Sequence, residues 1–244
     1  MNMFSIIMPV HNGEAFIKAA IDSVLAQSYH EYELIIINDA STDQSLAMID
    51  AYRAQDERIV LLHSQERGVA AARNVGIAAA KYRYICFLDC DDVWLPHKLE
   101  ESFAYFAQGH TMLYAFYTRC NAKNEVLNLV KAPLVIDYEH LLKGNCIGNL
   151  TGAYDSAVLG KFYQENIRHE DYRMWLSIVK KAGYGICIPE SLAYYRVNAG
   201  SLSSNKFKSL LWTWRMYRKH LGYGLWQSLY YWCHAVVRML NKRF

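Results

Sequence analysis

The chain has 244 residues, a net charge of +3 and an aromatic content of 14%. This length is enough for one domain with a full hydrophobic core and a short appendage. The charge is uneven: residues 1–190 contain 17 basic and 23 acidic side chains, whereas residues 191–244 contain nine basic and no acidic ones. This asymmetry predicts that the basic tail contacts an anionic surface.

The cysteine pattern and the first residues indicate where the protein works. Six cysteines occur without a CxxC pair or a zinc-ligand spacing. Residues 1–9 have neither the charged start nor the cleavage pattern of a secretory signal peptide. We therefore expect reduced thiols and a cytoplasmic setting.

Short apolar runs alternate with helical patterns in the first half of the chain. The expected strands are residues 5–10, 32–37, 59–62 and 84–88, and the clearest helix is 69–80. Residues 41–44 (Ser-Thr-Asp-Gln) form a capping-box pattern that predicts a helix start. Continuous apolar strands separated by helices are typical of a sheet covered on both faces. We expect an α/β fold with a mostly parallel, Rossmann-like central sheet flanked by helices.

The second half of the chain has a mixed pattern. We expect extended segments at 112–119 and 125–136, and a strand at 185–195 interrupted by Pro189. The expected helices are 138–143, 156–163 and 172–182. The chain is divided into a main domain, residues 1–205, and a C-terminal helical extension, residues 206–244.

The extension, residues 206–244, reads as two helices broken near Gly222 and Gly224. The second helix is apolar nearly all round, but His234 and Arg238 make it a poor transmembrane span. A basic, aromatic segment of low hydropathy is typical of an amphipathic helix that lies on a membrane surface. The alternative is a helical pair packed on the body of the protein or on a second subunit.

Carboxylates gather where the fourth expected strand ends, at Asp89-Cys90-Asp91-Asp92. In an open parallel sheet, ligands bind outside the carboxyl ends of the strands, so Pro9–Asn12 and Asn38–Asp39 are expected at the same edge. Crowded carboxylates repel one another unless a cation or hydrogen bonds compensate. Mg²⁺ or Mn²⁺ is the natural partner. The alternative is that Asp92 caps a helix beginning near Leu95.

Two further segments carry possible chemistry. Glu170 and Asp171 precede a helical pattern, where one carboxylate can act as a general base or both can complement the helix dipole. Arg73 follows Gly68 by about one helical turn and is suited to phosphate binding; its alternative is a surface arginine on an alanine-rich helix.

Taken in order, these motifs resemble the family 2 glycosyltransferases, whose fold is called GT-A. The resemblance covers about residues 3–205. The matching segments are Ser5–Asn12, Asn38–Asp43, Gly68–Asn74, Asp89–Asp92 with Trp94, and Glu170–Leu176.

The resemblance implies roles for individual residues. The nucleotide and donor sugar would be bound by Pro9, His11, Asp39, Arg73, Asp89, Asp91, Arg196 and Ser201. Asp92 would hold the metal, Mn²⁺ or Mg²⁺, with Asp91 and Asn198 as further ligands. Many relatives have a histidine near position 198, and the neutral asparagine oxygen is a weaker ligand. Asp171, or Glu170 beside it, would be the catalytic base.

The implied function is inverting sugar transfer from a nucleotide sugar, with UDP the commonest carrier in the family. The acceptor would be a hydroxyl of a saccharide or lipid-linked saccharide in surface polysaccharide or lipopolysaccharide synthesis. We expect a peripheral protein at the inner face of the cell membrane, without a nucleic-acid partner. A homodimer is one assembly that we consider.

Other functional classes fit less well. A dehydrogenase would need a glycine fingerprint, which Pro9–Gly13 lacks. A sugar nucleotidyltransferase would need a glycine-rich phosphate loop near the start of the chain. A non-catalytic, membrane-docked nucleotide-sugar-binding protein remains the main alternative.

Overall fold

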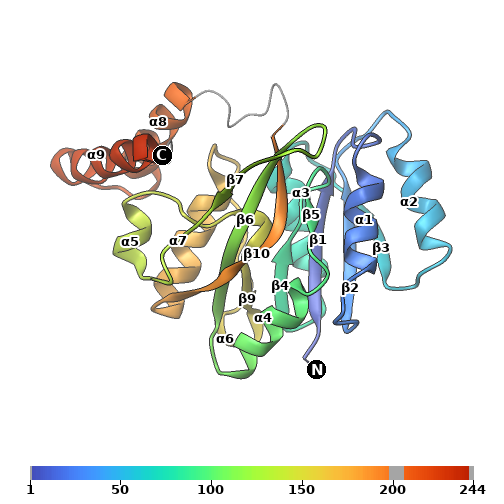
Figure 1. The fold of residues 1–244 in the computed structure, drawn as a ribbon. Coiled ribbons are helices and arrows are strands. Elements are labelled where there is room, and N and C mark those ends of the chain that lie inside the picture. Colours follow the sequence, from blue (N-terminus) through green and yellow to red (C-terminus); the bar gives the residue numbers. More distant parts are fainter. Residues whose placement is uncertain (1, 198–205, 242–244) are drawn as a thin grey trace.

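The computed structural model describes residues 2–197 and 206–241. In this part of the chain, ten strands form one mixed sheet with the order β3-β2-β1-β4-β9-β6-β10-β5; β7 pairs with β6, and β8 with β10 (Figure 1). The strands are β1 (Phe4–Val10), β2 (Tyr32–Asn38), β3 (Ile59–His63), β4 (Tyr84–Phe87), β5 (Val93–Trp94), β6 (Met112–Asn121), β7 (Val126–Val130), β8 (Val135–Ile136), β9 (Ala153–Asp155) and β10 (Gly185–Val197). Strands β1 to β4 pair in parallel, as does β10 with β6. The α/β prediction is confirmed.

Both faces of the sheet are covered, which explains why β1, β2 and β4 are buried at every position. Alternate residues of β1 point to opposite faces: Ile6 and Met8 join one core cluster, and Ile7 joins the other. The first cluster includes residues of α1 (Ile17–Leu25), α2 (Ser45–Arg53) and α4 (Lys98–Ala107). The second includes residues of α3 (Val69–Ala79), α5 (Tyr138–Leu142), α6 (Ser156–Leu159) and α7 (Glu170–Ala182).

Helix α3 lies unusually close to the sheet. A Cβ atom built on Gly76 would lie only 2.7 Å from Ile37 Cδ1 and 2.7 Å from Ile7 Cγ2. Only glycine therefore permits this approach of helix to strand. Arg73 lies about one turn earlier on α3, so this contact sets the height of its side chain above the sheet.

Three local predictions were wrong. The capping box is absent: α2 begins at Ser45 without a side-chain cap, and Asp43 instead accepts hydrogen bonds from the backbone N–H groups of Ser45 and Glu14. Helix α6 ends at Leu159 because Gly160 has a φ of +77°. Pro189 does not interrupt β10; the pairing with β6 shifts register between Ile188 and Ser191 and absorbs it.

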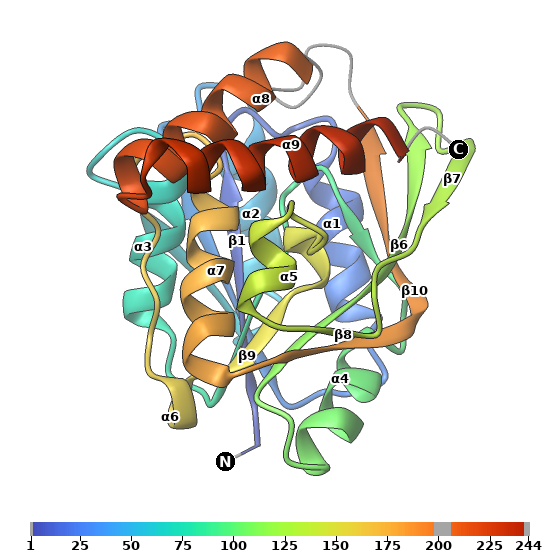
Figure 2. The same cartoon turned by 90° about the vertical axis from the view of Figure 1, so that its left-hand side faces the viewer.

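The chain after residue 205 forms α8 (Lys206–Arg215), a π-helical turn η3 (Met216–His220) and α9 (Leu225–Asn241), with the break where Gly222 and Gly224 predicted it. Tyr217 Oη donates to Leu142 O at 2.6 Å, and Arg238 Nη1 donates to Gly144 O at 2.8 Å. Figure 2 shows α9 crossing in front of α5 and α7, with α8 above it. The helical pair thus packs on the body, and no helix in the described residues is long and apolar enough to cross a membrane.

Candidate active site

The loops that follow β1 and β2 are joined at the carboxyl edge of the sheet. Asp39 N donates to Val10 O at 2.8 Å, and His11 Nδ1 contacts Asp39 O, so this nitrogen carries the proton. Asp39 Oδ2 accepts from Gly68 N at 2.9 Å, which links the pair to the start of α3. Pro9 is a buried residue of β1. The structure therefore brings together the residues predicted to hold the nucleobase.

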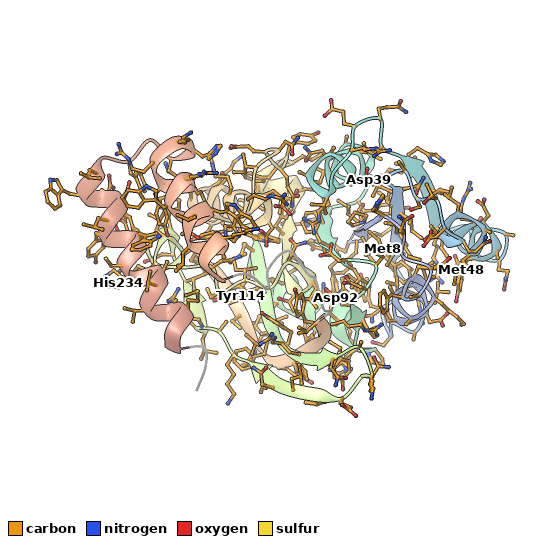
Figure 3. The ribbon with its side chains drawn as sticks, turned by 90° about the horizontal axis from the view of Figure 1, so that it is seen from above. Met8, Asp39, Met48, Asp92, Tyr114 and His234 are labelled. Carbon is orange, nitrogen blue, oxygen red and sulfur yellow. The ribbon has the colours of Figure 1, made fainter. Side chains whose placement is uncertain are left out.

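Asp92 lies at the centre of this edge when it is seen from above (Figure 3). Its side chain is buried, and Oδ1 accepts from the backbone N of Arg196 at 3.0 Å. Burial and the charges of Asp89 and Asp91 raise the pKa of Asp92 well above its usual value. The alternative role as a helix cap is wrong, because α4 begins only at Lys98 and has no side-chain cap.

Arg73 joins two of the acidic motifs in the interior. Nη2 lies 2.7 Å from Asp89 Oδ1, and Nη1 lies 3.2 Å from Glu170 Oε1 and 3.3 Å from Gln164 Oε1. With 4% of its surface exposed, it is not a surface arginine. Burial opposes the charged form, but Asp89 and Glu170 outweigh it and raise the pKa of Arg73. The guanidinium therefore fixes the end of β4 relative to the start of α7.

The two candidate bases occupy the first turn of α7, where the helix dipole favours negative charge. Burial and the charge of Asp171 raise the pKa of Glu170, against the opposing effect of Arg73. Burial and Tyr195 raise the pKa of Tyr117 to about 12, with further contributions from Asp92 and Asp171. Tyr117 thus lies near both the candidate base and the candidate metal ligand, whereas Glu170 is engaged by Arg73.

Three residues near these groups were not predicted from the sequence. Gln164 is buried and accepts from Arg73, and the ring of Tyr117 lies 2.7 Å from where a Cβ on Gly148 would be. Asn149, in the short helix η1 (Asn149–Thr151), has both polar side-chain atoms inaccessible and without a partner in the described part of the chain. None of these three residues belongs to a recognisable motif. The sequence offers one related feature, Trp94, whose Nε1 donates to Leu150 O in η1 at 2.7 Å.

Arg196 meets this edge through its backbone. Its guanidinium lies over the ring of Phe16, 4.9 Å from the centroid, and donates to Asn124 Oδ1 at 3.0 Å. The two other predicted contacts of this segment, Asn198 and Ser201, lie outside the described residues.

The acidic edge suits a cation that is held partly by substrate. Among the described residues there is no group of three or more His, Cys, Asp or Glu side chains arranged to hold a metal ion. Asp91 and Asp92 fit the way Mg²⁺ is commonly bound, through one or two carboxylates and substrate phosphates. The pKa of Asp92 is raised first by burial and then by the charges of Asp89 and Asp91, and a divalent cation would offset these charges.

Residues 5–167 match the family model described as glycosyl transferase family 2. The chain belongs to this family. It is 37% identical over 234 residues to an uncharacterized glycosyltransferase of Haemophilus influenzae, covering 95% of this chain and 94% of that relative. It is 34% identical over 247 residues to the putative teichuronic acid biosynthesis glycosyltransferase TuaG of Bacillus subtilis, covering 98% of each. A third relative, 37% identical over 221 residues and covering 87% of this chain and 84% of its own length, is the Escherichia coli UDP-Glc:alpha-D-GlcNAc-diphosphoundecaprenol beta-1,3-glucosyltransferase WfgD.

Solved structures share the fold of this glycosyltransferase. S. aureus TarS 1–349 in complex with UDP-GlcNAc superimposes with a TM-score of 0.71 at 21% identity over 83% of this chain and 61% of that one. The mannosyltransferase PcManGT from Pyrobaculum calidifontis, in complex with GDP-Man and Mn²⁺, gives 0.67 at 16% identity over 91% of this chain and 64% of that one. The family 2 prediction and the GT-A fold are confirmed.

Proposed function

We propose that this glycosyltransferase moves a sugar from a UDP-sugar to a hydroxyl of a lipid-linked saccharide, with inversion at the anomeric carbon. The observation that carries the proposal is the Arg73 bridge. By binding both Asp89 and Glu170, Arg73 holds the donor-side carboxylates and the candidate bases at a fixed separation. The names of relatives that act on diphosphoundecaprenol-linked sugars support the acceptor class.

The donor would bind along the edge formed by β1, β2 and β4. His11 presents Nε2 as an acceptor because Nδ1 carries its proton toward Asp39 O, and Asp39 would contact the nucleobase. Asp89 and Asp91 would face the ribose and donor sugar. Asp92, with Asp91, would hold a Mg²⁺ or Mn²⁺ ion, which would neutralise charge at the diphosphate.

The base in this proposal is Asp171. Its carboxylate takes the proton of the acceptor hydroxyl while that oxygen forms a bond to the anomeric carbon. The bond from this carbon to the diphosphate oxygen breaks on the opposite face, and the nucleoside diphosphate leaves. Glu170, bound to Arg73, positions the first turn of α7 and keeps Asp171 as the carboxylate available to the acceptor.

We further propose that α9 contacts the membrane where the lipid-linked acceptor resides. Its outer face exposes Trp226, Leu229, Tyr230 and Val237, which line an apolar groove of about 400 Å³ with Cys233 and His234. Aromatic and aliphatic side chains on one face of a helix in a basic segment are typical of interfacial helices. The division into residues 1–205 and 206–244 stays a prediction.

The function is tested by nucleoside diphosphate release from a panel of nucleotide sugars, with a lipid-diphosphate N-acetylglucosamine as acceptor, in the presence of Mn²⁺ or excess chelator. Asp92→Asn and Asp171→Asn should each lower transfer by about 100-fold or more. Asp50→Asn, in an exposed ion pair with Arg53, is the matched control. Near-normal turnover in either site variant would refute that residue's role, and donor binding without turnover in the wild type would support the non-catalytic alternative.

A further inference from the structure

A basic cavity lies next to the N-terminus of α7, the helix whose first turn carries the candidate bases. It measures about 380 Å³ and is lined by Ile167, Arg168, Trp212, Arg215, Lys219 and His220. The first two residues lead into α7, and the other four lie along α8 and η3. Figure 2 shows α8 passing over the upper end of α7, where these segments meet.

The cations around this cavity are not neutralised by the protein. In the ranges 2–197 and 206–241, Arg168, Arg215 and Lys219 form no ion pair shorter than 4.0 Å. The nearby Glu165 is already paired, with Oε1 3.2 Å from Arg173 Nε and Oε2 3.4 Å from His220 Nδ1. Convergent, unpaired basic side chains are the usual means of binding phosphate oxygens.

The helix is arranged to present these charges on one side. Arg215 and Lys219 are four residues apart, a spacing at which like charges on a helix repel each other. Met216 and Tyr217 are fully buried against the body, so the opposite side of this turn is fixed. The turn itself is π-helical, a rare conformation that occurs frequently at functional sites. Arg168 is held over the ring of Trp212, 5.3 Å from the centroid.

The cavity is close to the candidate base. Arg168 precedes Asp171 by three residues, which span at most about 10 Å of chain. His169, between them, has its Nε2 3.2 Å from Ser209 O, and this contact ties the start of α7 to α8.

We propose that this cavity binds the diphosphate of a lipid-diphosphate-linked acceptor sugar. The proposal rests on the proposed function and deepens it: Arg168, Arg215 and Lys219 hold the phosphate oxygens, and the acceptor sugar extends from them toward Asp171. Trp212 forms an apolar wall beside the first atoms of the lipid chain. The acceptor is thus recognised by its diphosphate.

Binding can be measured without turnover. Farnesyl diphosphate is titrated by calorimetry into the full chain with UDP and Mn²⁺ in excess, so that the donor site is filled. Arg215→Gln and Lys219→Gln should each weaken binding about 10-fold, whereas Lys208→Gln on the same helix, outside the cavity, should not. Uncharged farnesol should not bind. Equal affinity of the wild type and the double variant for farnesyl diphosphate would overturn the proposal.

Two further arms separate the possible sources of phosphate. Binding to phosphatidylglycerol vesicles tests whether the cavity is a site for a lipid headgroup. If the double variant, Arg215→Gln with Lys219→Gln, no longer bound these vesicles and the wild type did not bind farnesyl diphosphate, the proposal would also be overturned. In transfer assays the double variant should raise KM for the lipid-diphosphate acceptor with kcat within about 2-fold, and leave KM for a neutral alkyl glycoside unchanged. If farnesyl diphosphate binds as expected but no lipid-linked sugar is ever glycosylated, the subsite stands and the proposed function fails.

Discussion

Two groups of charged side chains lie at the N-terminus of α7, and they differ in whether their charges are paired within the protein. In one group Arg73 forms ion pairs with both Asp89 and Glu170 in the interior. In the other group Arg168, Arg215 and Lys219 line an open cavity, without an ion-pair partner in the part of the chain that the structure describes. Both groups contribute arginines close to the same helix end.

The difference separates two uses of arginine. A buried arginine that binds two carboxylates holds them at set distances, so Arg73 fixes the end of β4 relative to the start of α7. An unpaired, solvent-facing arginine keeps its donors for a ligand oxygen. Sequence composition cannot distinguish the two, because Arg73 and Arg168 are each followed within a few residues by polar side chains.

The largest effect is expected from breaking the interior group. Arg73→Met removes the cation and leaves Asp89 and Glu170 partly buried and unpaired, which should cost about 3–5 kcal/mol of the free energy of unfolding. Transfer should fall about 100-fold or more, since a displacement of about 1 Å at a reacting group has an effect of this size. Urea unfolding and turnover of the purified protein measure both.

The matched control for Arg73 is Arg53→Met, which removes an arginine from an exposed ion pair with Asp50. It should change stability by less than about 0.5 kcal/mol and leave turnover intact. If Arg73→Met resembled this control, the interior group would not position the site.

The acidic limb of the pH–rate profile should report the carboxylates at the start of α7. The pKa of Glu170 lies above 4.5. As pH falls, this group therefore binds a proton earlier than an ordinary glutamate does and loosens its contact with Arg73. Glu170→Gln should move the loss of kcat/KM to lower pH and reduce the plateau by only about 10-fold. If Glu170→Gln lost all activity and Asp171→Asn retained it, Glu170 would be the base and Asp171 the positioning residue.

A third prediction concerns the exposed apolar face of α9, which is expected to bind membranes through burial of its side chains and not through ion pairs. Trp226 is 80% exposed and Tyr230 is 52% exposed. Replacing each by Gln should weaken partitioning to phosphatidylglycerol vesicles about 10-fold, because burial of one such side chain contributes about 1.5–3 kcal/mol. Leu134→Gln, on an equally exposed leucine of the body (58%), is the control in a flotation assay. Unchanged flotation of the α9 variants would contradict membrane contact through this face.

The smallest effect concerns a cation that is buried without any carboxylate. Lys98 is fully buried, its Nζ has no hydrogen-bond partner in the described residues, and it lies 4.1 Å from the centre of the Trp94 ring. Burial lowers its pKa below 10.5. Between the lowered value and 10.5 the unfolded chain binds more protons than the folded one, so stability should rise with pH.

This rise should not exceed about 1.4 kcal/mol per pH unit. Lys98→Met should abolish it and stabilise the fold by about 1 kcal/mol at neutral pH. Thermal unfolding at a series of alkaline pH values measures the slope, with the exposed Lys18→Met as the control. A slope that persists in Lys98→Met would assign the pH dependence to another group.

The sequence predicted the elements whose pattern is set by burial on both faces. Strands β1, β2 and β4 match their apolar runs because every residue of them is buried, whereas in β3 only Ile59 is buried. The predicted end of α6 was wrong because the positive φ of Gly160 ends the helix at Leu159. The predicted start of α2 was wrong because Asp43 accepts hydrogen bonds within the loop. The order of motifs predicted the edge of the sheet that carries the acidic groups. It could not predict the Arg73 bridge to Glu170, whose partners are 97 residues apart, or the cavity between α7 and α8.

The close contact of Gly76 with Ile7 and Ile37 has a consequence for how much change the site tolerates. A methyl group at this position would push α3 away from the sheet, with a typical overpacking cost of about 1–3 kcal/mol. Arg73 would move with the helix and lose its reach to Asp89. The requirement for glycine at position 76 therefore limits which sequences can keep this arrangement of charges. It couples the evolution of the core to that of the site.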